Sequence, residues 1–179
     1  MAEMAQRAAS LADLKDIWGL MKQVAGDIPF DLETEAAQES LLTEIMSCCT
    51  SGLSPVALDE DRSVVGALLV RRDDFEWGFR NSDAIHLSYA AIASSCKDNG
   101  VLASLIAKIQ EQKVPIFASV KSGNKFALAD ELVKRGFAHE CRAASGWGDL
   151  YKCGRRSTDA RPSFVPGLSR KLVTCRPRP

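Results

Sequence analysis

The sequence lacks the features that would place the chain in a membrane or mark it for export. No apolar run approaches the roughly 18 residues that a membrane-spanning helix needs. The first ten residues, MAEMAQRAAS, have neither the cationic start nor the apolar stretch of a secretory signal peptide. We therefore expect a soluble, cytoplasmic protein with no membrane partner.

Motifs for metals, nucleotides and nucleic acids are also missing. The two histidines, His86 and His139, lie at no zinc-type spacing from the six cysteines, which form no CxxC pair. We expect no metal and, without export, reduced thiols. There is no GxGxxG or GxxxxGKS/T motif for a dinucleotide or a nucleoside triphosphate. Basic residues are not interleaved with aromatics, so nucleic acid is not an expected partner.

The formal net charge of zero is an average over two unlike parts. Residues 1–153 carry 16 basic and 22 acidic residues, whereas residues 154–179 carry 7 basic and 1 acidic residue and four prolines. We expect a single globular domain over 1–153 and a basic tail over 154–179. Residues 1–61 hold 12 acidic and 3 basic residues, which indicates either attraction of a cationic ligand or a solvated helix face.

Apolar residues recur with helical spacing in four segments. The first helix is capped by Ser10 and runs to about Ala25, and the second ends at Ser51 and Gly52. The apolar faces expected for the four helices are Leu14, Ile17, Trp18 and Met21; Leu42, Ile45, Met46 and Cys49; Leu102, Leu105, Ile106 and Ile109; and, after an Asn124 cap, Phe126, Ala129 and Val133.

Strand patterns fill the rest of the domain. The expected strands are a short one at Arg7–Ala9, a hairpin around the turn at 59–62 with Val64–Val70 as its second strand, Ile85–Ile92, Pro115–Val120, and a closing region from Phe137 with a candidate at Trp147–Lys152. The order β-α-α-β-β-β-α-β-α-β predicts an α/β domain with a mixed sheet.

The segment AIHLSYAAIASSCKDNGVLASLIAKI is a strand that leads through a glycine-containing loop into a helix. The first amides of a helix have no intrahelical acceptor and favour an anion, and Gly100 permits close approach of its backbone. A glycine at such a junction also serves simply to make the turn.

This segment, the strand PIFASV and the run from Asn124 to Gly136-Phe137 together resemble the GNAT superfamily of acetyl-CoA-dependent N-acetyltransferases. The family's acyl-CoA loop, Q/R-x-x-G-x-G/A, corresponds to Lys97–Leu102. The resemblance implies a mixed, largely antiparallel central sheet flanked by helices. It also implies an acyltransferase that moves an acetyl group from acetyl-CoA to a primary amine of a small molecule or peptide.

The resemblance implies a set of cofactor contacts made mostly by backbone. Ile92 or its neighbour would bond the acetyl carbonyl, Ala93 and Ser94 would pair with the pantetheine arm, and Asn124 would reach it from the other side. The remaining contacts would come from the loop and helix start at Lys97, Asn99, Gly100, Val101, Leu102 and Ala103. Lys97, Asp98 and Leu102 depart from the usual loop, and Leu132 stands where the family often has a tyrosine acid. The alternative is therefore a catalytically inactive GNAT-like binding or regulatory module.

His86 is the expected general base, because a neutral imidazole accepts a proton from an ammonium near neutral pH. It lies six residues before Ile92, where some relatives carry a glutamate. Alternation predicts that His86, Ser88, Ala90 and Ile92 share one strand face, with Tyr89 on the opposite face. The structural alternative is a hydrogen-bonded histidine in a half-buried strand. His139 is expected to be exposed, and Cys96 an ordinary loop thiol.

The family's acceptor specificity is set largely by two loops, here 26–32 and 143–150. Ile28, Phe30 and Trp147 are therefore expected to line an apolar acceptor pocket. For the basic tail we consider disorder, weak binding of polyanions, or docking on the acidic helices of its own or another subunit, which would make a homodimer.

Overall fold

The computed structural model describes residues 4–27, 32–72, 84–96, 100–121, 128–142 and 148–154. The elements, in chain order, are β1 (Ala5–Ala8), α1 (Leu14–Gln23), α2 (Glu35–Thr50), β2 (Pro55–Leu58), β3 (Val64–Arg72), β4 (Ile85–Ile92), α3 (Val101–Gln110), β5 (Ile116–Val120), α4 (Leu128–Lys134), β6 (Ala138–Arg142) and β7 (Asp149–Cys153). The predicted order of elements is confirmed up to α4. After α4 the structure has two strands, β6 and β7, where the predicted order ended in a single strand. None of the described helices is both long and apolar enough to cross a membrane.

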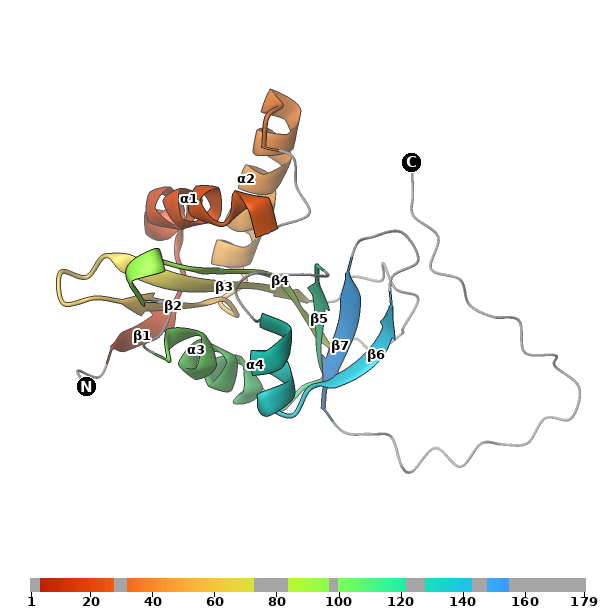
Figure 1. Cartoon of the computed structure of the whole chain (residues 1–179). Helices are drawn as coiled ribbons and strands as arrows, with labels where there is room; N and C mark the ends of the chain where they lie inside the picture. The colour runs from red at the N-terminus through yellow and green to blue at the C-terminus, as the bar shows by residue number, and fades with distance from the viewer. Residues whose placement is uncertain are drawn as a thin grey trace, which may run out of the picture.

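The strands form one sheet in the order β1-β2-β3-β4-β5-β7-β6 (Figure 1). Each neighbouring pair is antiparallel except β4 and β5, which run parallel. A parallel pair needs a crossover connection, and α3 supplies it between β4 and β5. The expected mixed, largely antiparallel sheet is confirmed.

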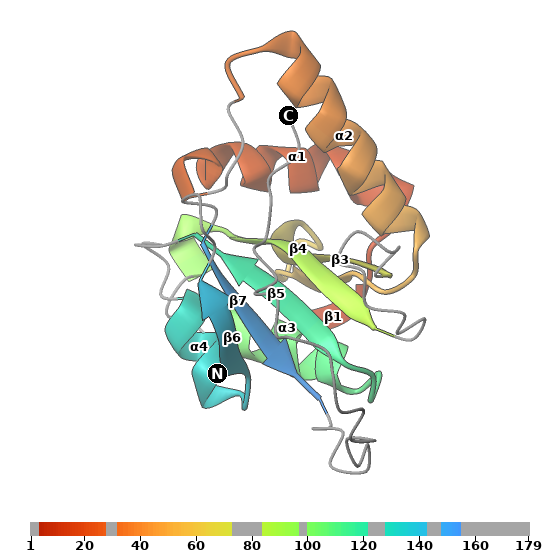
Figure 2. The ribbon, with the colours of Figure 1, turned by 90° about the vertical axis from the view of Figure 1, so that its right-hand side faces the viewer.

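Helices cover both faces of the sheet (Figures 1 and 2). We call the side that packs against α1 and α2 the α1/α2 face, and the other side the α3/α4 face. The core of the α1/α2 face includes Ile17, Met21, Leu41, Ile45, Leu69 and Ala91. The core of the α3/α4 face includes Leu68, Leu87, Leu105, Ile106, Ile116 and Leu132. Strands β2, β3 and β4 therefore contribute to two separate apolar layers, while β5 and β7 contribute to the α3/α4 core.

Two of the predicted helix faces are rotated from their expected positions. Met46 is 42% exposed, and the buried stripe of α2 instead consists of Leu41, Ile45, Cys48 and Cys49. Val133, which was expected to face inward, is 55% exposed because its neighbour Leu132 fills the core. The predictions for Met46 and Val133 were wrong by about one helical position, which the 3.6-residue period easily permits when several adjacent residues are apolar.

An ion pair joins the start of α1 to strand β1. Asp13 Oδ1 accepts a hydrogen bond from Arg7 Nη2 at 2.6 Å, while Asp13 Oδ2 accepts from the backbone N–H of Ser10 at 2.8 Å. Donation by Arg7, partly opposed by burial, lowers the pKa of Asp13 to about 2. Ser10, the predicted cap, therefore caps the short 3-10 turn Leu11–Asp13 that leads into α1, and Asp13 is the N-cap of α1 itself.

A glycine on β3 lets α3 approach the sheet closely. A Cβ at Gly66 would lie 2.8 Å from Val101 Cγ1 and 3.0 Å from Ile92 Cδ1. Val101 is the first residue of α3, and Ile92 is the last residue of β4. The missing side chain of Gly66 thus brings the N-terminus of α3 against the end of β4.

Candidate functional site

Strands β4 and β5 are paired over only part of their length. The pairs are Ile85 with Ile116, His86 with Phe117, and Leu87 with Ala118. Strand β4 continues to Ile92 and β5 to Val120, and the described residues show no further pairing between the two strands. We call the gap beyond Leu87 the β4–β5 opening. One edge of β4 therefore has no strand partner there among the described residues.

Backbone hydrogen bonds show which residues of β4 face this opening. Before the opening, the Ile85 N–H donates to Pro115 O at 2.9 Å, on the β5 side. At the far end, the Ala93 N–H donates to Val65 O at 2.8 Å, on the β3 side. Because successive residues of a strand direct their backbone groups to alternate sides, Ala90 and Ile92 face the opening.

This arrangement corrects one expected cofactor contact. The N–H of Ala93 is already bonded to Val65, and its C=O accepts from the Cys96 N–H at 2.9 Å. Ala93 was expected to pair with the pantetheine arm, but its N–H is already used in the sheet and is not available for that contact. Ala93 anchors the end of β4 instead, while the backbone of Ile92 keeps the orientation that the expected contact requires.

A β-bulge on β4 changes which side chains share a face. The pairing with β3 goes from Leu69–Tyr89 to Val70–Leu87, so Ser88 is an extra residue. Leu87 packs in the core of the α3/α4 face, whereas Tyr89 packs in the core of the α1/α2 face. Without the bulge, two residues two positions apart would lie on the same side.

The predicted side-chain faces of β4 were therefore wrong beyond the bulge. His86 lies between two residues of the α3/α4 face, Ile85 and Leu87, and so points to the α1/α2 face. Tyr89 shares that face with His86, whereas Ala90 and Ile92 pack toward the α3/α4 face. The imidazole and the phenol, which were expected on opposite faces, are both on the side of α1 and α2.

A half-buried charge cluster meets β4 on this side. Tyr89 Oη donates to Glu44 Oε2 of α2 at 2.9 Å, and Arg71 Nη1 of β3 lies 3.9 Å from Glu44 Oε1. Burial, followed by the charge of Glu44, raises the pKa of Tyr89, so the phenol stays protonated. Arg71 pairs across the strands with His86. Together the elements α2, β3 and β4 bring a carboxylate, a guanidinium, an imidazole and a phenol to one side of the opening.

Glu44 and Arg71 were not predicted as site residues. The sequence held one hint for Glu44. It lies three residues after Leu41 and four before Cys48, which places it on the edge of the buried stripe of α2. An acid on such an edge usually points to water, and only the tertiary structure shows that Glu44 reaches Tyr89 instead.

The N-terminus of α3 lies next to the end of β4. Gly100 has a left-handed φ of 71°, and its C=O accepts the first helical bond from the Ser104 N–H at 3.0 Å. The N–H groups of Val101, Leu102 and Ala103 precede that bond and have no acceptor within the helix. A Cβ at Gly100 would meet no atom within 4 Å, so the space beside it is open. Leu102, which replaces a small residue of the family loop, is half-buried against the α3/α4 core.

The remaining predicted residues fall into two groups. Lys97, Asn99, Asn124, Ile28, Phe30 and Trp147 lie outside the described residues. His139 is 41% exposed, as expected, and its Nε2 lies 3.5 Å from Asp149 Oδ2, away from the opening. Cys48, Cys49, Cys96 and Cys153 are free thiols. No cluster of potential metal ligands occurs in the part of the chain that the structure describes.

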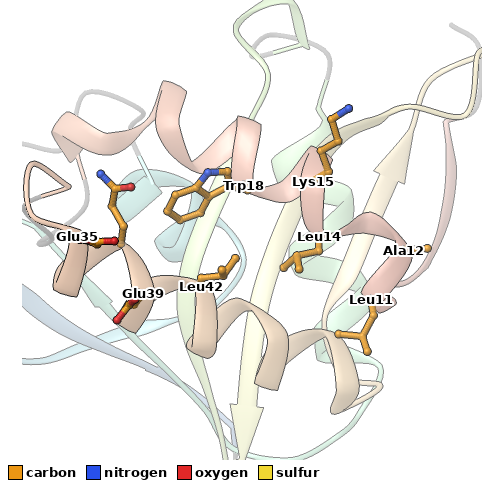
Figure 3. A pocket seen from close by; sticks show the side chains of 9 residues that line it. Leu11, Ala12, Leu14, Lys15, Trp18, Glu35, Glu39 and Leu42 are labelled. Atoms are coloured by element: carbon orange, nitrogen blue, oxygen red, sulfur yellow. The ribbon is translucent and has the colours of Figure 1, made fainter.

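A separate groove of about 540 Å³ lies between the start of α1 and the start of α2 (Figure 3). Leu11, Leu14, Trp18 and Leu42 form its apolar wall, and Glu35 and Glu39 border it. No residue of β4 or β5 lines it. It is thus distinct from the β4–β5 opening.

Comparison with known proteins relates this chain to others through its fold. No protein-family model matches the sequence, and no curated protein matches it either. Many solved structures do match the fold.

Three of these solved structures are acetyltransferases. A phosphinothricin acetyltransferase of the GNAT superfamily from Sinorhizobium meliloti, in complex with AcCoA, is 18% identical with a TM-score of 0.62, over 84% of this chain and 86% of the other. A GNAT-family acetyltransferase from Bacillus cereus is 19% identical with a TM-score of 0.63, over 86% and 99%. A diaminobutyrate acetyltransferase from Paenibacillus lautus, in complex with its substrate and coenzyme A, is 17% identical with a TM-score of 0.62, over 86% and 96%. The chain therefore has the GNAT fold.

Proposed function

We propose that this chain is an acyltransferase that moves an acetyl group from acetyl-CoA to a primary amine at the β4–β5 opening. The observation that carries the proposal is the unpaired edge of β4, with the backbone of Ala90 and Ile92 directed into the opening. Solved proteins with this fold include complexes with AcCoA and with coenzyme A, which supports the choice of acyl donor.

The described residues fit such a donor at two places. The backbone of Ile92 and Ala90 would pair with the pantetheine arm and donate to the thioester oxygen, and Ser94 follows at the end of the strand. The N–H groups from Gly100 to Ala103 would bind the pyrophosphate at the positive end of the α3 dipole. The space beside Gly100 and the inward packing of Leu102 leave that approach open.

When bound, acetyl-CoA would supply an activated thioester, and the chain would supply orientation and proton transfer. The amine nitrogen forms a bond to the acetyl carbon while the carbon–sulfur bond breaks, and the leaving sulfur takes a proton. We assign His86 as the base that accepts the proton of the ammonium, directly or through a water molecule. Its place on the α1/α2 face, three residues before Tyr89, supports this role.

The test measures binding and turnover separately. Acetyl-CoA at about 100 times its Kd should stabilise the protein by roughly 2.7 kcal/mol in thermal denaturation. Thiol release from acetyl-CoA should then be measured across a panel of primary amines. His86→Ala should lower kcat about 100-fold or more and leave acetyl-CoA binding intact. The matched control, His139→Ala, alters the other histidine and should change neither.

A catalytically inactive binding module is the second candidate. It is favoured by the residue at the position of the family's frequent tyrosine acid, because Leu132 is fully buried in the core and can donate no proton. Stabilisation by acetyl-CoA without thiol release for any amine would support this module. No stabilisation by any acyl-CoA would contradict both candidates.

A further inference from the structure

Glu44 differs from the other described acids of its helix. Glu35 and Glu39 are exposed on α2 and border the groove between α1 and α2. The Glu44 side chain is 21% exposed, contacts β4 through the Tyr89 hydroxyl at 2.9 Å, and lies 3.9 Å from Arg71 of β3. The carboxylate is therefore held between the helix and the sheet while part of it still meets solvent.

The contact with Tyr89 places this carboxylate relative to the proposed reaction. Tyr89 precedes Ala90, whose backbone faces the β4–β5 opening, and its side chain rises toward α2. A tyrosine side chain and a hydrogen bond thus separate Glu44 from the backbone of β4. A reacting nitrogen has to lie within about 3–3.5 Å of the carbon that it attacks. Because the Tyr89 side chain lies between Glu44 and the strand, the carboxylate is placed for a second group of the same molecule rather than for the reacting nitrogen.

The chemistry of Glu44 favours a cation as that second group. A carboxylate offers about four acceptor sites, and the phenol of Tyr89 donates one hydrogen bond to them. Arg71 Nη1 forms an ion pair with the other oxygen at 3.9 Å, which is longer than a hydrogen bond and leaves acceptor sites for a further donor. An alkylammonium has three donors, and a hydrogen bond between charged groups is stronger than one between neutral groups. Because burial keeps Tyr89 protonated, the phenol remains a donor that fixes the orientation of the carboxylate.

We propose that Glu44 binds a second ammonium group of the acceptor, so that the preferred acceptors are linear aliphatic diamines or molecules containing one. This inference rests on the proposed function, since it identifies the substrate class of the same site. Tyr89 is a positioning residue for Glu44, and His86 remains the base for the reacting nitrogen.

Matched amines test the inference by turnover. 1,4-Diaminobutane should have a KM about 10- to 100-fold below that of butylamine, which has the same carbon chain but lacks the second ammonium. Glu44→Gln keeps the size of the side chain and removes its charge. It should raise KM for the diamine about 10- to 100-fold, leave butylamine unchanged, and alter kcat by no more than a few fold. Glu39→Gln, on the exposed side of the same helix, should change neither amine.

A binding measurement tests the inference without turnover. In calorimetric titrations of the full, folded chain, Glu44→Gln should weaken binding of 1,4-diaminobutane about 10-fold or more relative to the wild type. Tyr89→Phe keeps the carboxylate and should weaken binding less than Glu44→Gln does. Equal KM or Kd values for the two amines, or for wild type and Glu44→Gln, would overturn the inference. If acetyl-CoA binds and both amines are acetylated equally well, the inference fails while the proposed function stands.

Discussion

The two faces of the central sheet differ in composition and in what they can do. The buried core of the α3/α4 face, as far as the described residues show it, is built from aliphatic and aromatic side chains. The α1/α2 face buries Cys48, Cys49 and Tyr89, and the half-buried charges of Glu44 and Arg71 lie beside them. A face that holds charges and a phenol next to an opening is suited to chemistry, and a face with a large apolar core is suited to stability. We therefore expect mutations on the two faces to separate folding from activity.

The largest loss of stability is expected on the α3/α4 face. Leu105 of α3 is fully buried and packs near Gly66 of β3. Leu105→Ala should lower the free energy of unfolding by about 2–5 kcal/mol, because it removes buried methyl groups and leaves a cavity. Urea denaturation followed by circular dichroism measures this loss.

Val133→Ala is the matched control for Leu105→Ala. Val133 is 55% exposed on α4, so its truncation should change the free energy of unfolding by no more than about 0.5 kcal/mol. If the two variants lost similar stability, the α3/α4 face would not be the close-packed layer described above.

A smaller, pH-dependent contribution is expected from the ion pair at the edge of the α1/α2 face. The pKa of Asp13 is lowered from an ordinary 3.8 to about 2, mainly by the Arg7 hydrogen bond. The folded state therefore binds this proton less readily than the unfolded state does. The pair stabilises the protein above about pH 4, and this stabilisation is lost as the pH falls toward 2.

Asp13→Asn tests this contribution. The variant should lose about 1–2 kcal/mol at pH 7, a value below the full shift because the Arg7 side chain is 44% exposed and solvent screens the pair. The wild type and the variant should then converge in stability near pH 2. Asp61→Asn, in an exposed turn, is the control and should follow the wild type. A constant difference between wild type and Asp13→Asn across this pH range would contradict the assignment.

Periodicity was sufficient to predict most of the fold. Apolar spacing located the helices because each buries one stripe, and the strand at Ile85–Ile92 has the predicted bounds. The pattern could not fix which neighbour of an apolar pair points inward, so Met46 and Val133 were misplaced. Two apolar residues in a row fit the helical period equally well, and only packing against the sheet decides between them.

The site was harder to predict because it depends on register. The bulge at Ser88 comes from the pairing of β4 with β3, and nothing in the alternation of IHLSYAAI reveals it. It reverses the expected relation between His86 and Tyr89. Glu44 reaches Tyr89 across 45 positions of sequence, a contact that exists only after α2 has packed on the sheet. Local spacing thus located the strand and the loop, while tertiary contacts decided which side chains meet there.

The smallest effect on stability is expected from the basic tail, which lies outside the described residues apart from Gly154. We propose that residues 154–179 act on the acidic helices rather than on the fold, because seven basic residues in the tail oppose twelve acidic residues in positions 1–61. Removing residues 155–179 should change the free energy of unfolding by less than about 0.5 kcal/mol. It should instead change the Kd for cationic acceptors or the sedimentation coefficient, and more so at low salt than at high salt, because salt screens attraction between exposed charges. If acceptor affinity and assembly were both unaltered at low salt, the charge difference between the tail and the helices would have no functional consequence. Acceptor binding on the α1/α2 face would then depend on Glu44 and its neighbours alone.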